Sequence, residues 1–258
     1  MNGTALRSAD ELRARLQTLV FTPDRLGVVK GGPSARRAYL DRTLGRLFPS
    51  RADLPSEYAA AVGQRNAALR RLTAGTSSPD ALEPWTERVA GLGAELVAAR
   101  GDAIAVITPS FVRTGELLGL EGAALAYEGE PVTREELEAR LPRDLERGVT
   151  GAGPHLHEIR VEAAGRDLRS FGSQGEQRIA VLALVLGEAS VIAERTGAPP
   201  LVLLDDVLSE LDADRRRALA ELISAGGQTV VTTTAAAALP GEPAQSLVVT
   251  PGQVRAAA

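Results

Sequence analysis

Two adjacent carboxylates follow the most apolar run of the chain. Leu201–Leu204 is a continuous apolar stretch, and Asp205 and Asp206 come directly after it. Such a run predicts a strand of a parallel sheet, and ligands bind beyond the carboxyl ends of these strands. There, one carboxylate could hold Mg²⁺ and the other could orient or deprotonate a water for nucleotide hydrolysis. By itself, however, the dipeptide favours an ordinary helix N-cap with first-turn acids.

A second group of residues, upstream, changes that balance. The sequence SQGEQ begins a strongly apolar helix and consists of Ser173, Gln174, Gly175, Glu176 and Gln177. Free N–H groups and the helix dipole at such a terminus favour a phosphate, although a well-capped core helix would also explain Ser173. Capping alone does not explain the order that follows, in which SQGEQ, a helix, LVLLDD and then SELD with Asp212 succeed one another.

This order of motifs resembles that of the ABC-type ATPases, with a signature motif (SQGEQ), a Walker B strand (LVLLDD) and a D-loop (SELD). Within that superfamily the chain resembles RecF, a family of bacterial recombination and replication-repair proteins. The similarity extends to LVFTPDRLGVVKGGPSARRAYLD near the start, to GPH, and to GRDLRSFGSQGEQR. The resemblance implies an α/β fold, an ABC-type P-loop ATPase head with an incomplete parallel-sheet lobe and an inserted, mainly helical lobe.

The resemblance also implies a role for each motif residue. Ser173 and Gly175, within the cofactor-binding signature, would contact the γ-phosphate of ATP bound to the other subunit of a head-to-tail dimer. Asp205 would hold Mg²⁺, and Asp206 would be the catalytic acid that acts on the hydrolytic water. Asp212 would lie at the dimer interface and align the two sites.

The function implied by this resemblance is ATP-dependent DNA binding in recombinational gap repair and replication restart. The protein would act as an ATP-dependent homodimer on gapped DNA or single/double-strand junctions, together with mediators of the RecO and RecR kind. Local arginine clusters are candidates for phosphate contacts, although scattered arginines are usually a solvated helix face. The clusters are Arg36, Arg37, Arg42 and Arg46, then Arg65, Arg70 and Arg71, and, as weaker candidates, Arg215, Arg216 and Arg217.

The sequence departs from the family in one important respect. It contains no G-x-x-x-x-G-K-[ST] loop, the motif that wraps the β- and γ-phosphates. The alternative hypothesis is therefore a truncated, non-catalytic homologue that cannot bind ATP by itself; a general transport or regulatory ABC subunit fits less well. If an N-terminal part is missing, we expect an unpaired sheet edge and exposed apolar surface. In addition, Thr233 stands where many ABC proteins have a histidine, and LHE follows GPH.

Composition narrows the class of protein. The 258 residues are 44% hydrophobic and 3% aromatic, carry a formal charge of −4 and include no cysteine. This composition predicts a folded protein that neither coats nucleic acid with its whole surface nor stacks bases on aromatic platforms. Without an apolar run of membrane length or a signal peptide, we expect a cytoplasmic protein with no membrane partner. His155 and His157 could share a face and bind metal, but a solvated strand edge is the favoured interpretation.

Periodicity and capping signals place the elements. We expect domains at 1–32 (a remnant of the N-terminal ATPase lobe), 33–148 (the helical lobe) and 149–258 (the C-terminal part of the ATPase lobe). The expected helices begin at Ser34, at Leu54, at Ser78–Pro79 and at Thr133, whose capping partner is Glu136, and then span Gly175–Arg195 and 213–223. The expected strands are Leu16–Phe21, a hairpin turning near Gly165, 201–206 and 229–233, and the parallel sheet should be covered on both faces.

Overall fold

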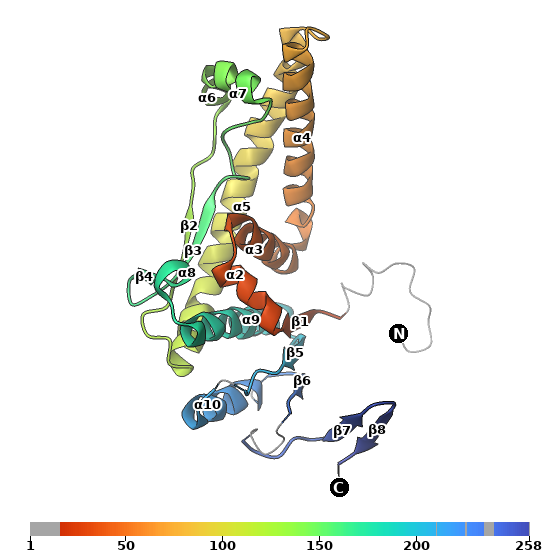
Figure 1. Ribbon diagram of the computed structural model, residues 1–258, viewed down its shortest axis with the longest axis vertical. Coiled ribbons are helices and arrows are strands. Elements are labelled where there is room, and N and C mark those ends of the chain that lie inside the picture. The colour runs from red at the N-terminus through yellow and green to blue at the C-terminus, as the bar shows by residue number, and fades with distance from the viewer. Residues whose placement is uncertain (1–15, 210, 225, 235–239, 258) are drawn as a thin grey trace.

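The structure is a computed structural model that describes residues 16–209, 211–224, 226–234 and 240–257. Figure 1 shows an elongated molecule in which long helices project from a base that holds a parallel sheet. We call α4 (Leu54–Thr73), the first half of α5 (Glu83–Leu117), α6 (Arg134–Ala139) and α7 (Leu141–Arg147) the arm. The base consists of β1 (Thr18–Phe21), β5 (Leu201–Asp205), β6 (Thr229–Thr232), α9 (Gln174–Thr196) and α10 (Ala213–Ser224). The domain boundaries drawn from the sequence stay a prediction, since α5 runs through both regions.

The base is built on a small parallel sheet. It contains β1 (Thr18–Phe21), β5 (Leu201–Asp205) and β6 (Thr229–Thr232) in the order β1-β5-β6. In the register of the sheet, Phe21 lies opposite Leu204, and Asp205 lies opposite Thr232. The predicted strands are therefore present and parallel, each slightly shorter than expected. β5 connects to β6 through α10 (Ala213–Ser224), which is the usual crossover between parallel strands.

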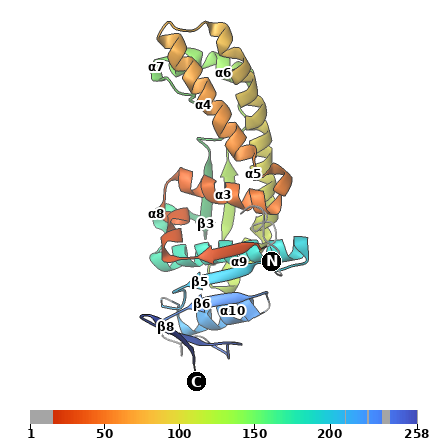
Figure 2. The same ribbon diagram turned by 90° about the vertical axis from the view of Figure 1, so that its right-hand side faces the viewer.

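Only one face of this sheet is covered within the described residues. Leu19 and Leu204 are buried on the side of α9 (Gln174–Thr196), and Leu219 of α10 belongs to the same core cluster as Leu204. On the opposite face, Leu203 is half-buried and Val230 is 46% exposed. Figure 2 shows the strands in front of α9 and α10 with that face toward the viewer. The prediction of a sheet covered on both faces is thus wrong for the described residues, because an apolar run shows only that cover is needed.

The exposed apolar surface and unpaired edges expected from the sequence are present. In the described part of the chain, β1 and β6 each have one neighbouring strand. A separate hairpin of β7 (Leu247–Thr250) and β8 (Gln253–Ala256) also exposes apolar side chains, with Val249 at 74% and Val254 at 65% exposure. Surface of this kind is typical of a site for a partner or of an aggregation-prone edge.

The arm is a pair of long antiparallel helices. α4 (Leu54–Thr73) and α5 (Glu83–Leu117) pack along a seam that includes Tyr58, Val62 and Val89. The apolar faces of the two helices are therefore buried against each other within one chain. The start of the second helix differs from the prediction: Pro79–Ala81 forms a 3₁₀ turn, Ser78 makes no side-chain cap, and α5 begins at Glu83. Pro109 lies inside α5.

The helices around this pair follow local signals. α3 (Pro33–Leu47) begins one residue earlier than predicted, with Gly32 as N-cap and Pro33 in the first turn. Thr133 and Glu136 form the predicted capping box of α6 (Arg134–Ala139), and α7 (Leu141–Arg147) follows. Short helices lie at α2 (Gly27–Lys30) and α8 (Leu168–Phe171), with 3₁₀ turns at Pro23–Leu26 and Pro49–Arg51.

An antiparallel ribbon joins the arm to the base. β3 (Glu158–Ala163) and β4 (Arg166–Asp167) form the predicted hairpin, which turns at Gly165, with φ of +70°. The main partner of β3, however, is β2 (Ala124–Glu128), a strand that the sequence analysis did not identify. Figure 1 shows this ribbon running alongside α5. In the part of the chain that the structure describes, no helix is both long and apolar enough to cross a membrane.

Candidate functional site

The carboxylate pair lies at the carboxyl end of β5, as predicted. The Oδ1 atom of Asp205 accepts a hydrogen bond of 2.5 Å from the hydroxyl of Thr232, and the backbone N–H of Asp206 donates to that same hydroxyl at 3.2 Å. Thr232 occupies the position opposite Asp205 in the parallel register. One hydroxyl on β6 therefore fixes both acidic residues. The sequence analysis missed Thr232, although the register of two parallel strands would have indicated it.

Asp206 adopts a backbone conformation that is unusual for a side-chain-bearing residue. Its φ is +47°, in the left-handed region, and only Ala164 shares this property among the other described non-glycine residues. The Ser209 hydroxyl lies 3.2 Å from both the Asp206 Oδ2 atom and its carbonyl oxygen. This conformation costs roughly 1–2 kcal/mol for most residues, and such strain tends to occur at functional sites. A carboxylate held in this way motivates a functional role for Asp206.

The SQGEQ residues form the first turn of α9, as predicted. The Ser173 hydroxyl accepts a hydrogen bond from the Glu176 N–H at 3.2 Å, and the Glu176 carboxylate accepts one from the Ser173 N–H at 2.7 Å. The latter bond lowers the pKa of Glu176 because it stabilises the charged form. Ser173 and Gln174 are exposed, whereas Gln177 is buried and donates to the Leu168 carbonyl at 2.7 Å. The first residues of the motif are therefore exposed, whereas Gln177 at its end is held inside the protein.

Gly175 faces open space at the exposed start of the motif. A Cβ atom added there would meet only the Ser173 Oγ, at 4.0 Å. The packing of this chain therefore does not require glycine at this position. Glycine in a helix costs roughly 0.5–1 kcal/mol relative to alanine, so the chain carries a cost that its own described contacts do not explain.

The signature end and the carboxylate pair lie on different elements of the chain. The signature residues begin α9, which has 23 residues and is therefore about 34 Å long. β5 follows the C-terminus of α9 after the connector 197–200, and its five residues end at Asp205. Within the described residues, no hydrogen bond joins Asp205 or Asp206 to the first turn of α9.

Asp212 lies just before α10. Its Oδ1 accepts a hydrogen bond from the Arg215 backbone N–H at 2.9 Å, and its Oδ2 lies 3.5 Å from the Arg215 guanidinium. The side chain is 59% exposed, so capping α10 leaves it accessible. Glu210, also in SELD, lies outside the described residues.

The side chains fit a magnesium site of the kind that phosphates complete. Within the described residues, no group of three or more His, Cys, Asp or Glu side chains could enclose a metal ion. Mg²⁺ does not need such a cage, because in phosphoryl-transfer sites it is usually held by one or two carboxylates, waters and the substrate phosphates. The exposed Asp205 carboxylate meets that requirement.

The two histidines have other partners. They precede β3 and do not lie on a strand, contrary to the sequence expectation. The Tyr58 hydroxyl is 2.8 Å from the His155 Nδ1, and the Tyr127 hydroxyl is 2.8 Å from the His157 Nδ1. The His155 Nε2 lies 3.0 Å from the Thr150 carbonyl oxygen. Burial lowers the pKa of both imidazoles, which favours a neutral, hydrogen-bonded structural role.

Several arginines considered for DNA contacts are engaged inside the protein. Arg36 pairs with Glu158 at 2.8 Å, Arg46 with the buried Glu188 at 2.8 Å, and Arg65 with Asp144 at 2.7 Å. Arg37 is half-buried and donates to the His157 carbonyl. From the first two groups, the exposed members are Arg42, Arg70 and Arg71.

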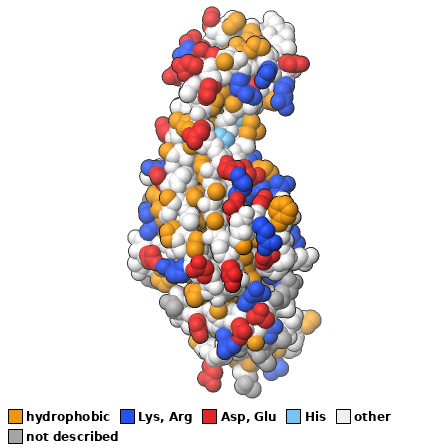
Figure 3. All heavy atoms as spheres, turned by 90° about the vertical axis from the view of Figure 1, so that its left-hand side faces the viewer, with side chains coloured by type: hydrophobic (Ala, Val, Ile, Leu, Met, Phe, Trp, Pro, Cys, Tyr) orange, Lys and Arg blue, Asp and Glu red, His pale blue; other side chains and the backbone are white. Residues whose placement is uncertain are grey.

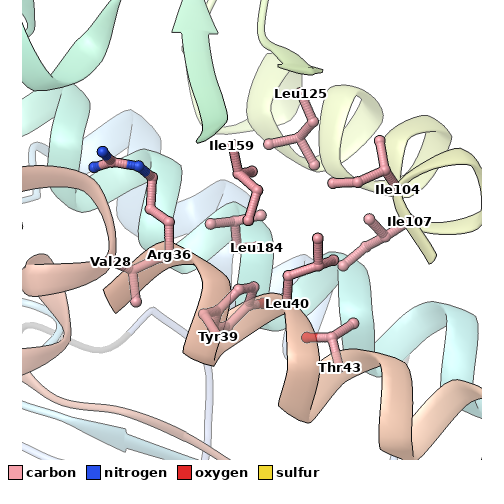
Figure 4. Close-up of a pocket in the computed structure, with 10 residues that line it drawn as sticks. All are labelled: Val28, Arg36, Tyr39, Leu40, Thr43, Ile104, Ile107, Leu125, Ile159 and Leu184. Carbon is pink, nitrogen blue, oxygen red and sulfur yellow. The ribbon is translucent and has the colours of Figure 1, made fainter. Parts of the chain in front are cut away.

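A small internal cavity is not a ligand site. Figure 4 shows it between α3, α5, α9 and the β2–β3 ribbon, lined mainly by apolar side chains such as Leu40, Ile107 and Leu184. Its volume is about 20 Å³, roughly the space of one water molecule. The guanidinium of Arg36 points away from it and pairs with Glu158. The cavity is therefore a packing gap where the arm meets the base.

Comparison with known proteins decides the family. No family model matches the sequence. The chain is 38% identical over 248 residues to the DNA replication and repair protein RecF of Heliobacterium modesticaldum, covering 91% of this chain and 67% of that protein. The chain belongs to the RecF family. It is also 36% identical over 252 residues to RecF of Myxococcus xanthus, covering 91% of this chain and 66% of that relative.

Solved RecF structures share the whole fold of this chain. A structure of the recombination mediator protein RecF with ATP matches with a TM-score of 0.83 and 28% identity, covering 100% of this chain and 72% of that one. A second RecF structure from the same RecFOR pathway gives a TM-score of 0.82. These matches confirm the predicted α/β fold with a parallel sheet and a large helical region. The chain spans about two thirds of the length of the RecF relatives named above.

Proposed function

We propose that this chain supplies the signature helix and the Walker B strand of a RecF-type, ATP-dependent DNA-binding protein that acts as a nucleotide-driven homodimer. Its role is recombinational gap repair and replication restart. The observation that carries the proposal is the open Gly175 beside the exposed Ser173, a helix start whose glycine is not explained within the chain. The relatives support it, since they are named DNA replication and repair proteins and one was solved with ATP.

The exposed groups at the start of α9 and at the carboxyl end of β5 suit a composite ATP site. Ser173 and the free N–H groups of the first turn would bind the γ-phosphate of ATP held by the partner subunit. Asp205 would hold Mg²⁺, which neutralises phosphate charge, and Asp206 would orient the attacking water. Phe171, two residues before Ser173, is 69% exposed, which fits an interface beside the signature.

The phosphate-binding loop must come from outside this sequence. A complete site would need a P-loop from a longer chain or from a separate peptide, because the sequence contains none. The alternative function is that of a non-catalytic homologue that cannot bind ATP by itself. The lack of a P-loop motif in the sequence favours this alternative. Native mass spectrometry of the protein from its own cells, with and without ATP, separates the two. A longer chain or a bound P-loop peptide supports the first, and a solitary 258-residue species without nucleotide supports the second.

The proposed partners are DNA and mediator proteins of the RecO and RecR kind. The solved relatives are RecF proteins of the RecFOR pathway, which is consistent with recombination mediators as partners. Gapped DNA or a single/double-strand junction is the proposed substrate. Arg42, Arg70 and Arg71, exposed in the structure, are the remaining phosphate-contact candidates from the first two arginine groups.

A matched pair of glycine substitutions tests the dimer. Gly175→Ala should leave the monomer as stable or make it more stable by about 0.5–1 kcal/mol, yet abolish ATP-dependent dimerisation, because the new methyl group occupies the contact surface. Gly63→Ala is the control, since Gly63 lies within α4 and also faces open space. Thermal melts and native mass spectrometry with ATP give both readouts. If the two variants dimerise equally well, Gly175 is not at a subunit interface.

A further inference from the structure

The upper end of the arm carries a group of exposed arginines, which we call the basic tip. It consists of Arg70 and Arg71 in the last turn of α4 and Arg143 and Arg147 on α7, all exposed. α7 packs against α4, and the Arg70 guanidinium donates to the Gly148 carbonyl at 3.4 Å. Arg143 and Arg147 are one helical turn apart, about 6 Å along the axis. Residues distant in the sequence therefore form one surface.

These arginines have no acidic partners, in contrast to their surroundings. Within the described residues, none of the four forms a salt bridge. On the neighbouring side of the arm, Arg134 contacts three carboxylates at 3.0 Å or less. Figure 3 shows acidic and basic side chains gathered on opposite sides of this upper end. The charge at the basic tip is thus left available to an external anion.

Helix capping accounts for only part of this cluster. Arginines in a last turn complement the helix dipole, which would explain Arg70, Arg71 and Arg147. It does not explain Arg143, in the middle of α7. Arg140 adds a further guanidinium at i−3 from Arg143, although it is half-buried and one of its nitrogens donates to the Gly151 carbonyl at 2.9 Å. Positive charge therefore continues along α7 beyond the turn where the dipole acts.

The chemistry of the surface favours backbone phosphates over a protein partner. Planar guanidinium groups bind phosphate oxygens in a bidentate manner. Protein interfaces usually centre on large apolar or aromatic anchors, and among the large hydrophobic residues of the described tip only Val149 is exposed, at 40%. No exposed aromatic residue is present there to stack on bases. The surface thus suits contacts that do not depend on base sequence.

We propose that the basic tip binds the phosphate backbone of DNA, at a site separate from the nucleotide-binding end of the molecule. This inference rests on the proposed function, because it assigns the DNA of that function to one surface. It places DNA contact at the end of α5 opposite to the end that reaches the base. DNA and nucleotide would then occupy opposite ends of the same long helix.

A double substitution with a matched control tests the surface. Arg143→Gln/Arg147→Gln removes two positive charges from the basic tip. The control, Arg88→Gln/Arg113→Gln, removes two positive charges from exposed positions on α5, outside the tip. The measurement is fluorescence anisotropy of a gapped DNA duplex over a series of salt concentrations, on the protein as it is isolated from its own cells. We expect the tip variant to lose about tenfold or more in affinity and its salt slope to fall by about 2, one for each lost phosphate contact.

Three other outcomes of this experiment would overturn the inference. If the wild-type protein binds no DNA at any salt concentration, both the proposed function and the inference fail. If it binds and the tip and control variants behave alike, only the inference fails. If the tip variant keeps DNA binding but loses binding to an acidic polypeptide such as polyglutamate, the surface recognises a protein instead. Circular dichroism melts check that both variants are folded.

Discussion

The arm and the base of this molecule differ in how they satisfy their polar groups. In the arm, the fully buried Arg65 donates to Asp144 at 2.7 Å, to Thr150 at 3.0 Å and to Thr86 at 3.2 Å, all within the same region. In the base, Ser173 and Asp205 are exposed, and one face of the sheet has no cover in the described residues. The interior of the arm around Arg65 is therefore closed and hydrogen-bonded, whereas the base holds Ser173 and Asp205 at an exposed surface.

This difference shows where function is to be sought. Buried polar groups that are fully hydrogen-bonded make a structure rigid and specific, while exposed carboxylates add little to stability and stay available to a ligand. In the base, Asp206 with its left-handed backbone and the unexplained Gly175 both belong to the motifs that we propose to form the ATP site. The features that weaken the base as a fold are those that the proposed ATP site needs.

The largest expected effect comes from breaking the internal charge pair of the arm. Arg65→Ala leaves the Asp144 carboxylate, which is 2% exposed, without its guanidinium. Removing one partner of a buried pair typically costs about 3–5 kcal/mol of unfolding free energy. Urea denaturation measures the loss, and hydrogen exchange should place it in α4 and α7 more than in α9. The exposed Arg113→Ala is the control. A loss as small as that of the control would mean that the arm does not depend on this pair.

The next-largest effect is a gain in stability, and it comes from a residue of the base. Asp206→Gly removes the cost of a left-handed conformation, so the free energy of unfolding should rise by about 1 kcal/mol while the carboxylate that we propose to orient water is lost. Asp206→Asn is the control because asparagine adopts this conformation about as readily as aspartate does, so its stability should match the wild type. Thermal melts of the three proteins provide the comparison. If Asp206→Gly is less stable than the wild type, Asp206 is not strained in the folded protein.

Local signals in the sequence predicted most of the helices and the positions of the motifs. Thr133 with Glu136 and the Ser173 cap are interactions between residues three apart in the chain, so their patterns are visible without a structure. The acids after Leu201–Leu204 were predicted at the end of a parallel strand for the same reason. The open face of the sheet was missed because an apolar strand looks the same whether or not a helix covers it.

Contacts between distant segments could not be predicted in this way. β2 pairs with β3 across about thirty residues, and the alternation that predicts β3 as a strand does not indicate which distant segment pairs with it. Thr232 holds Asp205 only because β6 lies beside β5 in one particular register. The burial of Arg65 depends on Asp144, which is 79 residues away. Each of these features is a property of the assembled fold and has no local signature.

Lowering the pH should also affect the arm and the base differently, because it changes the protonation of a buried histidine. Burial lowers the pKa of His155 from the ordinary value of 6.5, so at pH values below about 6.5 the unfolded chain binds more protons than the folded one. The stability contributed by neutral His155 is complete above pH 6.5 and is lost as the pH falls through and below that value. Urea denaturation at pH 7 and at pH 5.5 measures this loss, and hydrogen exchange should locate it around Tyr58 and Thr150.

A double substitution isolates this pH effect. The chain has two histidines, and burial lowers the pKa of both, so His155→Gln/His157→Gln removes the whole histidine contribution. The slope of stability between pH 7 and pH 5.5 should flatten in this variant. An unchanged slope would assign the pH dependence to the carboxylates instead.

The smallest expected effect is at Arg134, where the hydrogen bonds are as short as those of Arg65. Arg134 contacts Glu83, Glu87 and Glu138 at 2.7–3.0 Å, but its side chain is 39% exposed and the acids are more exposed still. Water and salt screen such contacts, so Arg134→Ala should change the urea midpoint far less than Arg65→Ala, and added salt should shrink the change further. A loss comparable to that of Arg65→Ala would mean that contact geometry, and not burial, sets the stability of the arm.

The expected result also means that arginines on the surface of the arm, including those of the basic tip, can be replaced without unfolding it. Any DNA affinity lost in those variants then reports on contact with DNA.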